Sequence, residues 1–95
     1  MTQTPQSPHI NPQELAGKTP AEIGEASRNA GLIPRGPDPD SGQGAYVDPV
    51  TGEQRVLIHP EHAHFHVNNP AGERLDINGQ VVAPESLAAH LPLRN

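Results

Sequence analysis

From about residue 44 onward, the chain alternates short β-rich segments with turn sequences. The turns are rich in Pro, Gly, Asn and Asp and fall at residues 48–52, 59–61, 68–72 and 78–79. The segments between them predict strands near residues 44–48, 54–59, 62–67, 73–77 and 80–82. Turns at this spacing favour an antiparallel meander, in which Asn78-Gly79 is the strongest hairpin signal.

Upstream of the strands, the pattern predicts one helix over residues 20–30. Its start carries a capping box with proline at the first helical position: Thr19, Pro20 and Glu22. Its apolar residues share one face at spacings of three and four: Ile23, Ala26 and Ala30. Gly31 is placed to end the helix in a left-handed conformation. Because the interior Gly24 costs about 1 kcal/mol relative to Ala, the helix needs a partner surface.

Three stretches lack a clear period. Residues 1–13 place three prolines among polar residues, which predicts a disordered arm. Residues 34–42 hold three prolines and two glycines, which predicts a surface loop. The tail over residues 84–95 predicts a turn of helix or an extended cover on the sheet. We therefore expect a single small α+β domain over residues 14–95, with one short helix packed on a four- to five-stranded antiparallel meander sheet.

Alternation along the strands sorts their side chains onto two faces. The predicted core face is apolar and comprises Ala45, Val47, Val56, Ile58, Ala63, Phe65, Val67, Leu75 and Ile77. The opposite face comprises Tyr46, Arg55, Leu57, His59, His62, His64, His66, Arg74 and Asp76. Nearly every residue of this second face is polar, so we look for chemistry there.

The run from His62 to His66 places three imidazoles on one predicted strand, about 7 Å apart along it. The leading interpretation is metal-independent cleavage of a phosphodiester: one histidine removes the ribose 2′ proton and another protonates the leaving oxygen. In this scheme Arg55 or Arg74 holds the phosphate. The predicted catalytic residues are then His64, His66, Arg74, Arg55 and Asp76.

Two other interpretations of the run stay open. In the first, His62, His64 and His66 bind zinc, with a further ligand available from His59, Glu61 or Asp76. The chain would then be a non-enzymatic metal-binding or protein-interaction module. In the second, the strand face is simply solvated and tolerates histidine.

Four neighbours of the run have both a functional and a structural interpretation. Arg74 and Asp76 either hold phosphate and orient a histidine, or form an ordinary surface salt bridge. Tyr46 either stacks on a base or is a sheet aromatic. Arg35 either reaches the same face or is a solvated loop charge. As substrate-binding residues we predict Tyr46, Arg35 and His59.

Composition limits these options. The absence of Cys excludes disulfides, thiol catalysis and Cys-ligated zinc. No apolar run approaches the roughly 18 residues of a membrane span, and the start does not match a signal peptide, so we expect a cytoplasmic protein with no membrane partner. The net charge of −5 argues against nucleic acid as a partner, but protonation of all six histidines would bring it to +1.

Together, five segments carry a family resemblance: residues 31–36, 46–52, 55–59, 64–68 and 72–76. Their order resembles the C-terminal toxin modules of bacterial polymorphic toxin systems, in particular the small ribonuclease-like modules of the barnase, EndoU and colicin types. The resemblance implies a metal-independent active site on the exposed sheet face, here His64, His66 and Arg74, acting on RNA such as tRNA. It also implies a cognate immunity protein as partner, and action in the cytoplasm of the producing or the target cell.

The oligomeric state follows from the sheet edges. A strand near residues 80–82 would leave an edge that could pair with a second chain. We expect a monomer, with a dimer through this edge as the alternative. The leading interpretation requires no cofactor, whereas the alternative requires zinc.

Overall fold

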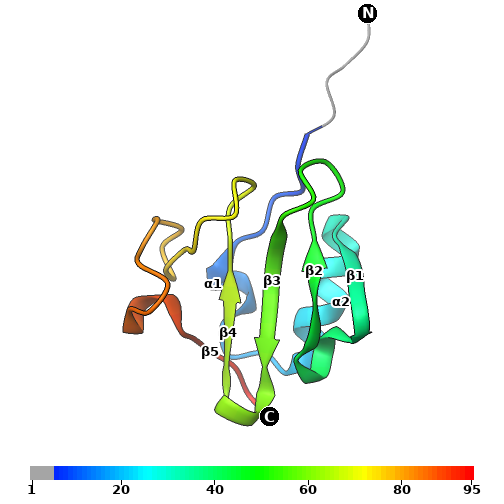
Figure 1. Cartoon of the computed structure of the whole chain (residues 1–95). Helices are drawn as coiled ribbons and strands as arrows, with labels where there is room; N and C mark the ends of the chain where they lie inside the picture. The colour runs from blue at the N-terminus through cyan, green and yellow to red at the C-terminus, as the bar shows by residue number, and fades with distance from the viewer. Residues whose placement is uncertain (1–5) are drawn as a thin grey trace, which may run out of the picture.

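Residues 6–95 are described by a computed structural model, in which helices cover one face of a five-stranded antiparallel sheet (Figure 1). The helices are α1 (Pro12–Leu15) and α2 (Pro20–Ala30). The strands are β1 (Ile33–Asp38), β2 (Gln43–Val47), β3 (Gln54–His59), β4 (His64–Val67) and β5 (Leu91–Pro92). Three short 3₁₀ turns complete the elements: η1 (Pro39–Ser41), η2 (Pro60–His62) and η3 (Leu87–Ala89). Strand order follows chain order, which confirms the α+β class and the predicted meander.

Helix α2 forms where the sequence predicts it. Thr19 Oγ1 accepts a bond from the Glu22 N–H at 3.2 Å, Glu22 Oε1 accepts from the Thr19 N–H at 3.0 Å, and Gly31 ends the helix with φ 107°. The structure also explains the interior glycine. A Cβ on Gly24 would lie 2.6 Å from the Tyr46 hydroxyl and would overlap the Asp40 carboxylate. Glycine is therefore needed for α2 to approach β2 and η1 this closely.

The prediction of a surface loop over residues 34–42 is wrong, because these residues form β1 and η1. Pro34 pairs with Tyr46 and Arg35 with Ala45 across an antiparallel ladder. The ladder tolerates proline because β1 is the edge strand of the sheet, where a missing N–H costs no inner hydrogen bond. The register shifts between Arg35 and Asp38, where Gly36 adopts a φ of 94°.

The hairpins β1–β2 and β3–β4 have the same type of turn, and in the second hairpin this turn contains His62, which was predicted to lie in a strand. Each turn is a 3₁₀ segment that begins with proline and ends at a left-handed residue, Gly42 (φ 95°) or Ala63 (φ 55°). Because Ala63 interrupts the alternation, β4 begins at His64 and not at residue 62. His62 is exposed in η2. Ala63 is also exposed, so its predicted place on the core face is wrong.

The strands predicted over residues 73–77 and 80–82 shrink to two isolated bridges, Asn68↔Arg74 and Leu75↔Val81. Two successive side-chain turns take up the backbone donors of this region. Asn69 Oδ1 accepts from two backbone N–H groups, at 3.0 and 2.9 Å. Asp76 Oδ1 accepts from two more, each at 2.9 Å. Side-chain turns of this kind compete with ladder formation.

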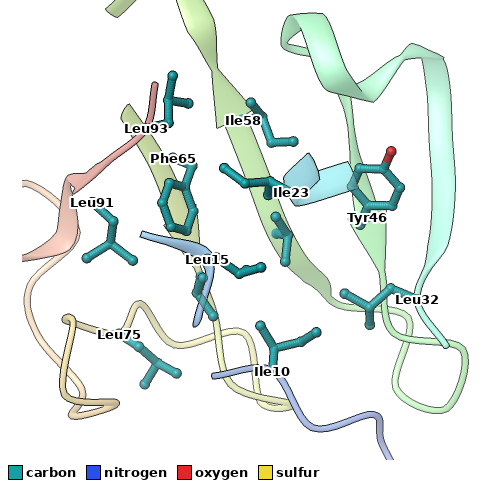
Figure 2. Packing of buried hydrophobic residues seen from close by; sticks show 12 residues of the cluster. Ile10, Leu15, Ile23, Leu32, Tyr46, Ile58, Phe65, Leu75, Leu91 and Leu93 are labelled. Atoms are coloured by element: carbon teal, nitrogen blue, oxygen red, sulfur yellow. The ribbon is translucent and has the colours of Figure 1, made fainter. Parts of the chain in front are cut away.

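The core lies between the helices and the sheet (Figure 2). It contains Ile10, Leu15, Ile23, Leu32, Tyr46, Val56, Ile58, Phe65, Val67, Leu75, Leu91 and Leu93. The face prediction is confirmed for Val56, Ile58, Phe65, Val67 and Leu75. It is wrong for Tyr46, which lies on the core side, and for Ala45 and Val47, which alternate with it in β2 and are buried outside the core cluster. The register pairs Tyr46 with Val56 and Val47 with Gln54, so Arg55 is an extra residue in β3. This irregularity could not be seen in the alternation of β2 alone.

Both ends of the described chain pack on the domain. Ile10 is buried in the core and Asn11 caps α1, so the predicted arm is wrong for residues 10–13. Residues 1–5 of the predicted arm lie outside the described residues. The tail forms both predicted features, since η3 is a turn of helix and Leu91 of β5 pairs with Phe65 of β4. Within residues 6–95, no helix is long and apolar enough to cross a membrane.

Candidate metal centre

Five histidines gather on the sheet face opposite the core. We call them the histidine cluster: His59, His62, His64, His66 and His90. The register pairs His59 with His64 and Leu57 with His66, so these residues alternate with core residues such as Phe65. The ring centroids of His64 and His66 are 4.9 Å apart, and both lie within 5.4 Å of the His59 centroid.

The rest of the cluster comes from two other parts of the chain. His90 follows η3, and its ring centroid lies 4.8 Å from that of His64 and 4.9 Å from that of His66. His62 of η2 stacks on His64 at 5.7 Å with an interplanar angle of 15°. His64 is therefore the centre of the cluster, in contact with rings from β3, β4, η2 and the tail.

Three members of the cluster have the geometry of a metal site. One ring nitrogen from each of His59, His64 and His66 lies within 4.8 Å of the other two. Nitrogen ligands of a tetrahedral zinc ion are about 3.4 Å apart, so small ring rotations would bring the three onto one ion. The predicted ligand set of His62, His64 and His66 is corrected at one position. His59 takes the place of His62, because the left-handed Ala63 removes His62 from the strand.

Backbone carbonyls fix the orientation of two imidazoles. His66 Nδ1 lies 2.8 Å from the Ala89 carbonyl oxygen, and His90 Nδ1 lies 2.7 Å from that of Ser86. A carbonyl oxygen only accepts, so each Nδ1 carries the proton and each Nε2 keeps its lone pair. Metal-binding histidines in general donate their other N–H to a carbonyl or carboxylate in this way.

Burial keeps the central imidazoles neutral. It lowers the pKa of His66 to about 4, against the opposing effect of the bond to Ala89 and with a smaller contribution from the charge of Arg74. Burial also lowers the pKa of His64, and the neighbouring histidines add to the shift. Both rings are therefore neutral near pH 7, which is the form that binds a metal and not the form that acts as a general acid.

The depressed pKa of His66 predicts acid-sensitive stability in metal-free protein. The unfolded chain takes up a proton near pH 6.5, whereas folded His66 stays neutral down to about pH 4. The unfolded state thus binds more protons between these values, and stability falls as the pH falls through this window. The loss from His66 approaches about 3 kcal/mol at the lower end.

Urea unfolding in EDTA from pH 7.5 to pH 4.5 measures this loss. The His66→Asn variant keeps a donor for the Ala89 carbonyl, because its Nδ2 is bonded to Cγ as Nδ1 of histidine is. It has no imidazole to titrate, so its stability should fall less steeply. Equal slopes for variant and wild type would contradict the assignment.

Arg74 flanks the cluster. It forms a backbone bridge with Asn68, which lies two residues after His66 and directly follows β4, and its Nε donates to Asn68 Oδ1 at 2.9 Å. Asn68 is buried and is held in turn by a 2.9 Å bond from its Nδ2 to the Gln54 carbonyl. Burial lowers the pKa of Arg74. None of the ion pairs within residues 6–95 involves this side chain.

Two predicted catalytic residues have structural partners instead. Arg55 is buried, and its guanidinium contacts the Asp48 carboxylate at 2.8 Å and the Asn68 carbonyl at 2.7 Å. This ion pair leaves Arg55 poorly placed to hold a phosphate. The Asp76 carboxylate accepts from the backbone of its own turn, and its hydrogen bonds within the described chain include none to a histidine.

Two predicted substrate-binding residues also lie away from the cluster. The Tyr46 hydroxyl bonds to Asp40 and accepts from Arg28 Nη1 at 2.8 Å under α2, and burial with the Asp40 bond raises the pKa of Tyr46 to about 12. Arg35 is exposed on β1, two strands away from β3. His59 is the one predicted substrate-binding residue that lies in the cluster.

Sequence reasoning missed His90 and Asn68. His90 is separated from His66 by 23 residues and lies in the tail, for which the sequence predicts only a turn of helix or an extended cover, so no spacing rule points to it. Asn68 was assigned to a turn signal.

No protein-family model, curated protein or solved structure matches this chain. The resemblance to toxin modules therefore stays a prediction, and function is argued from the geometry of the cluster.

Proposed function

We propose that this chain is a metal-binding protein in which His59, His64 and His66 hold one zinc or similar transition-metal ion. The observation that carries the proposal is the convergence of three ring nitrogens within 4.8 Å on one sheet face. The carbonyl-oriented His66 and the neutral state of the central rings support it. Imidazole ligands suit zinc, copper, nickel and iron, and zinc is the ion that most often takes tetrahedral histidine sites.

Three protein ligands leave one coordination position for water or a substrate. This is the composition of zinc sites that act on substrates, whereas structural zinc sites are closed by four protein ligands. Zinc in such a site lowers the pKa of its bound water toward about 7 and polarises oxygen atoms of bound groups. The proposed centre is thus suited to bind or hydrolyse a ligand that carries oxygen donors.

Calorimetric titration of zinc into metal-free protein at pH 7.5 tests the proposal. We expect one ion per chain with a Kd below about 1 μM. A chain that binds zinc only above about 100 μM, or only at exposed residues such as His9, would contradict the proposal.

A second candidate is the metal-independent ribonuclease that the sequence favours. Its support in the structure is the contact between the His64 and His66 rings beside the cationic Arg74. In this candidate the two histidines act as acid and base in 2′-hydroxyl attack on RNA. The chain would be a toxin domain with a cognate immunity protein, acting in the cytoplasm of the producing or target cell. The low pKa of His66 and the net charge of −5 weigh against it.

Incubation of total tRNA with the chain in EDTA separates the two candidates. Cleavage that persists in EDTA and is lost in His64→Ala and His66→Ala would establish the ribonuclease and remove the need for a metal. Tight zinc binding without cleavage in EDTA would favour the metal centre.

A further inference from the structure

We propose that the metal centre binds a phosphate group, with one phosphoryl oxygen at the open position of the ion and others held by the guanidinium of Arg74. This inference rests on the proposed function, since it assigns a ligand class to the same site. The carrying observation is a half-buried cation, without an acidic partner in the described chain, fixed beside the cluster.

Arg74 has the features of an anion-binding residue. Partial burial of a positive charge is unfavourable unless an anion offsets it. Within residues 6–95, the one side-chain hydrogen bond of Arg74 uses Nε, and its acceptor, the Asn68 amide oxygen, is neutral. The four N–H groups on Nη1 and Nη2 remain for a ligand. A planar guanidinium offers paired donors that match the oxygens of a phosphate.

The position of Arg74 is set by the fold. The chain of bonds from the Gln54 carbonyl through Asn68 to Arg74 Nε holds the guanidinium against the end of β4. Asn68 lies two residues beyond His66, directly after the end of β4, a separation of about 7 Å along extended backbone. For one phosphate to contact both groups, the ion and the guanidinium must lie about 5 Å apart, which is the span of the group between its outer contacts.

A cavity beside Arg74 gives the rest of a phosphate ester a place. It has a volume of about 240 Å³ and is lined by Gly72, Glu73, Arg74, Val81, Val82 and Pro84. Its apolar wall consists of Val81, Val82 and Pro84, of which Val81 is exposed. We therefore expect an organic phosphate with a small apolar group to bind more tightly than inorganic phosphate.

Cobalt provides the probe, because Co²⁺ replaces zinc in tetrahedral sites and its visible absorption reports on its ligands. Protein loaded with Co²⁺ should change its visible spectrum on titration with inorganic phosphate, and at lower concentration with phenyl phosphate. Arg74→Gln should weaken phosphate binding by at least about tenfold while it leaves the Co²⁺ affinity within about threefold. Arg74→Lys keeps the charge and loses the paired donors, so its phosphate affinity should lie between that of wild type and that of Arg74→Gln.

Arg35→Gln is the matched control, since it removes one exposed arginine elsewhere on the sheet and should leave phosphate binding unchanged. An unchanged spectrum in Co²⁺-loaded wild type, equal phosphate affinity in Arg74→Gln, or acetate binding as tight as phosphate would each overturn the inference alone. Failure to bind Co²⁺ at all would overturn the proposed metal centre and this inference with it. Circular dichroism of each variant confirms that it is folded.

Discussion

Replacement of His64 by alanine should abolish tight zinc binding, with a loss of affinity of at least about 100-fold. His64 is the central ring of the histidine cluster, with centroids of four other rings within 5.7 Å. It is also one of the three residues whose ring nitrogens converge. Removal of its imidazole leaves two candidate ligands, which do not complete a zinc site. Calorimetric titration of zinc at pH 7.5 measures the change.

His9→Ala is the matched control for this experiment. His9 is exposed and lies outside the cluster, so its loss should leave zinc affinity unchanged. His64→Ala is a cleaner variant than His66→Ala, because truncation of the buried His66 also strands the Ala89 carbonyl. Equal zinc affinity in His64→Ala and His9→Ala would show that the three converging nitrogens do not form the site.

His90 gives the experiment a graded outcome. Its ring contacts His64 and His66 but is not among the three whose nitrogens converge. His90→Ala should therefore weaken zinc binding by about tenfold, as expected for a residue that supports ligands from the side. A loss as large as that of His64→Ala would identify His90 as a direct ligand.

Replacement of Asp48 by alanine should destabilise the fold by about 3–5 kcal/mol, a large part of the stability of a small domain. The variant leaves buried Arg55 without its anion, and it removes the acceptor for the backbone N–H groups of Val50 and Thr51. Burial opposes ionisation of Asp48, but the hydrogen bonds around it outweigh this and hold its pKa below the usual value. Urea unfolding at pH 7.5 measures the loss.

Asp76→Ala is the matched control, because Asp76 is also a turn aspartate. Its carboxylate also accepts from two backbone N–H groups of its own turn, but no arginine pairs with it within the described chain. Asp76→Ala should cost only about 1 kcal/mol, the usual effect of a lost side-chain acceptor. Similar losses for Asp48→Ala and Asp76→Ala would contradict the importance of the buried ion pair. Should Asp48→Ala fail to fold, Asp48→Asn, which keeps one acceptor, still measures the lost charge.

The same ion pair supports the candidate site at a distance. Arg55 joins the β2–β3 turn, through Asp48, to the carbonyl of Asn68. Asn68 in turn orients Arg74 through its side chain. Arg55, predicted from the sequence as a catalytic residue, thus positions Asn68, which orients Arg74.

The sequence by itself determined the elements whose signals are local. Helix α2 follows from Thr19, Glu22 and Gly31, because capping interactions form among residues three or four apart. Strands β2 and β3 follow from β-rich segments between turn residues. The sequence also predicted that histidines would share one polar sheet face, since their spacing of two survives any register that keeps β4 extended.

Tertiary structure decided the features that depend on partners far along the chain. The prolines of β1 are tolerated because that strand lies at the sheet edge, which its own residues do not reveal. Tyr46 belongs to the core because the register pairs it with Val56, and an extra residue in β3 sets that register. The left-handed Ala63 keeps His62 out of β4, so the three converging nitrogens come from His59, His64 and His66. The tail places the ring of His90, 24 positions after His66 in the sequence, beside the ring of His66. The sequence gives the type of each side chain. Which side chains become its neighbours depends on strand register and on contacts between distant segments, and only the folded structure fixes these.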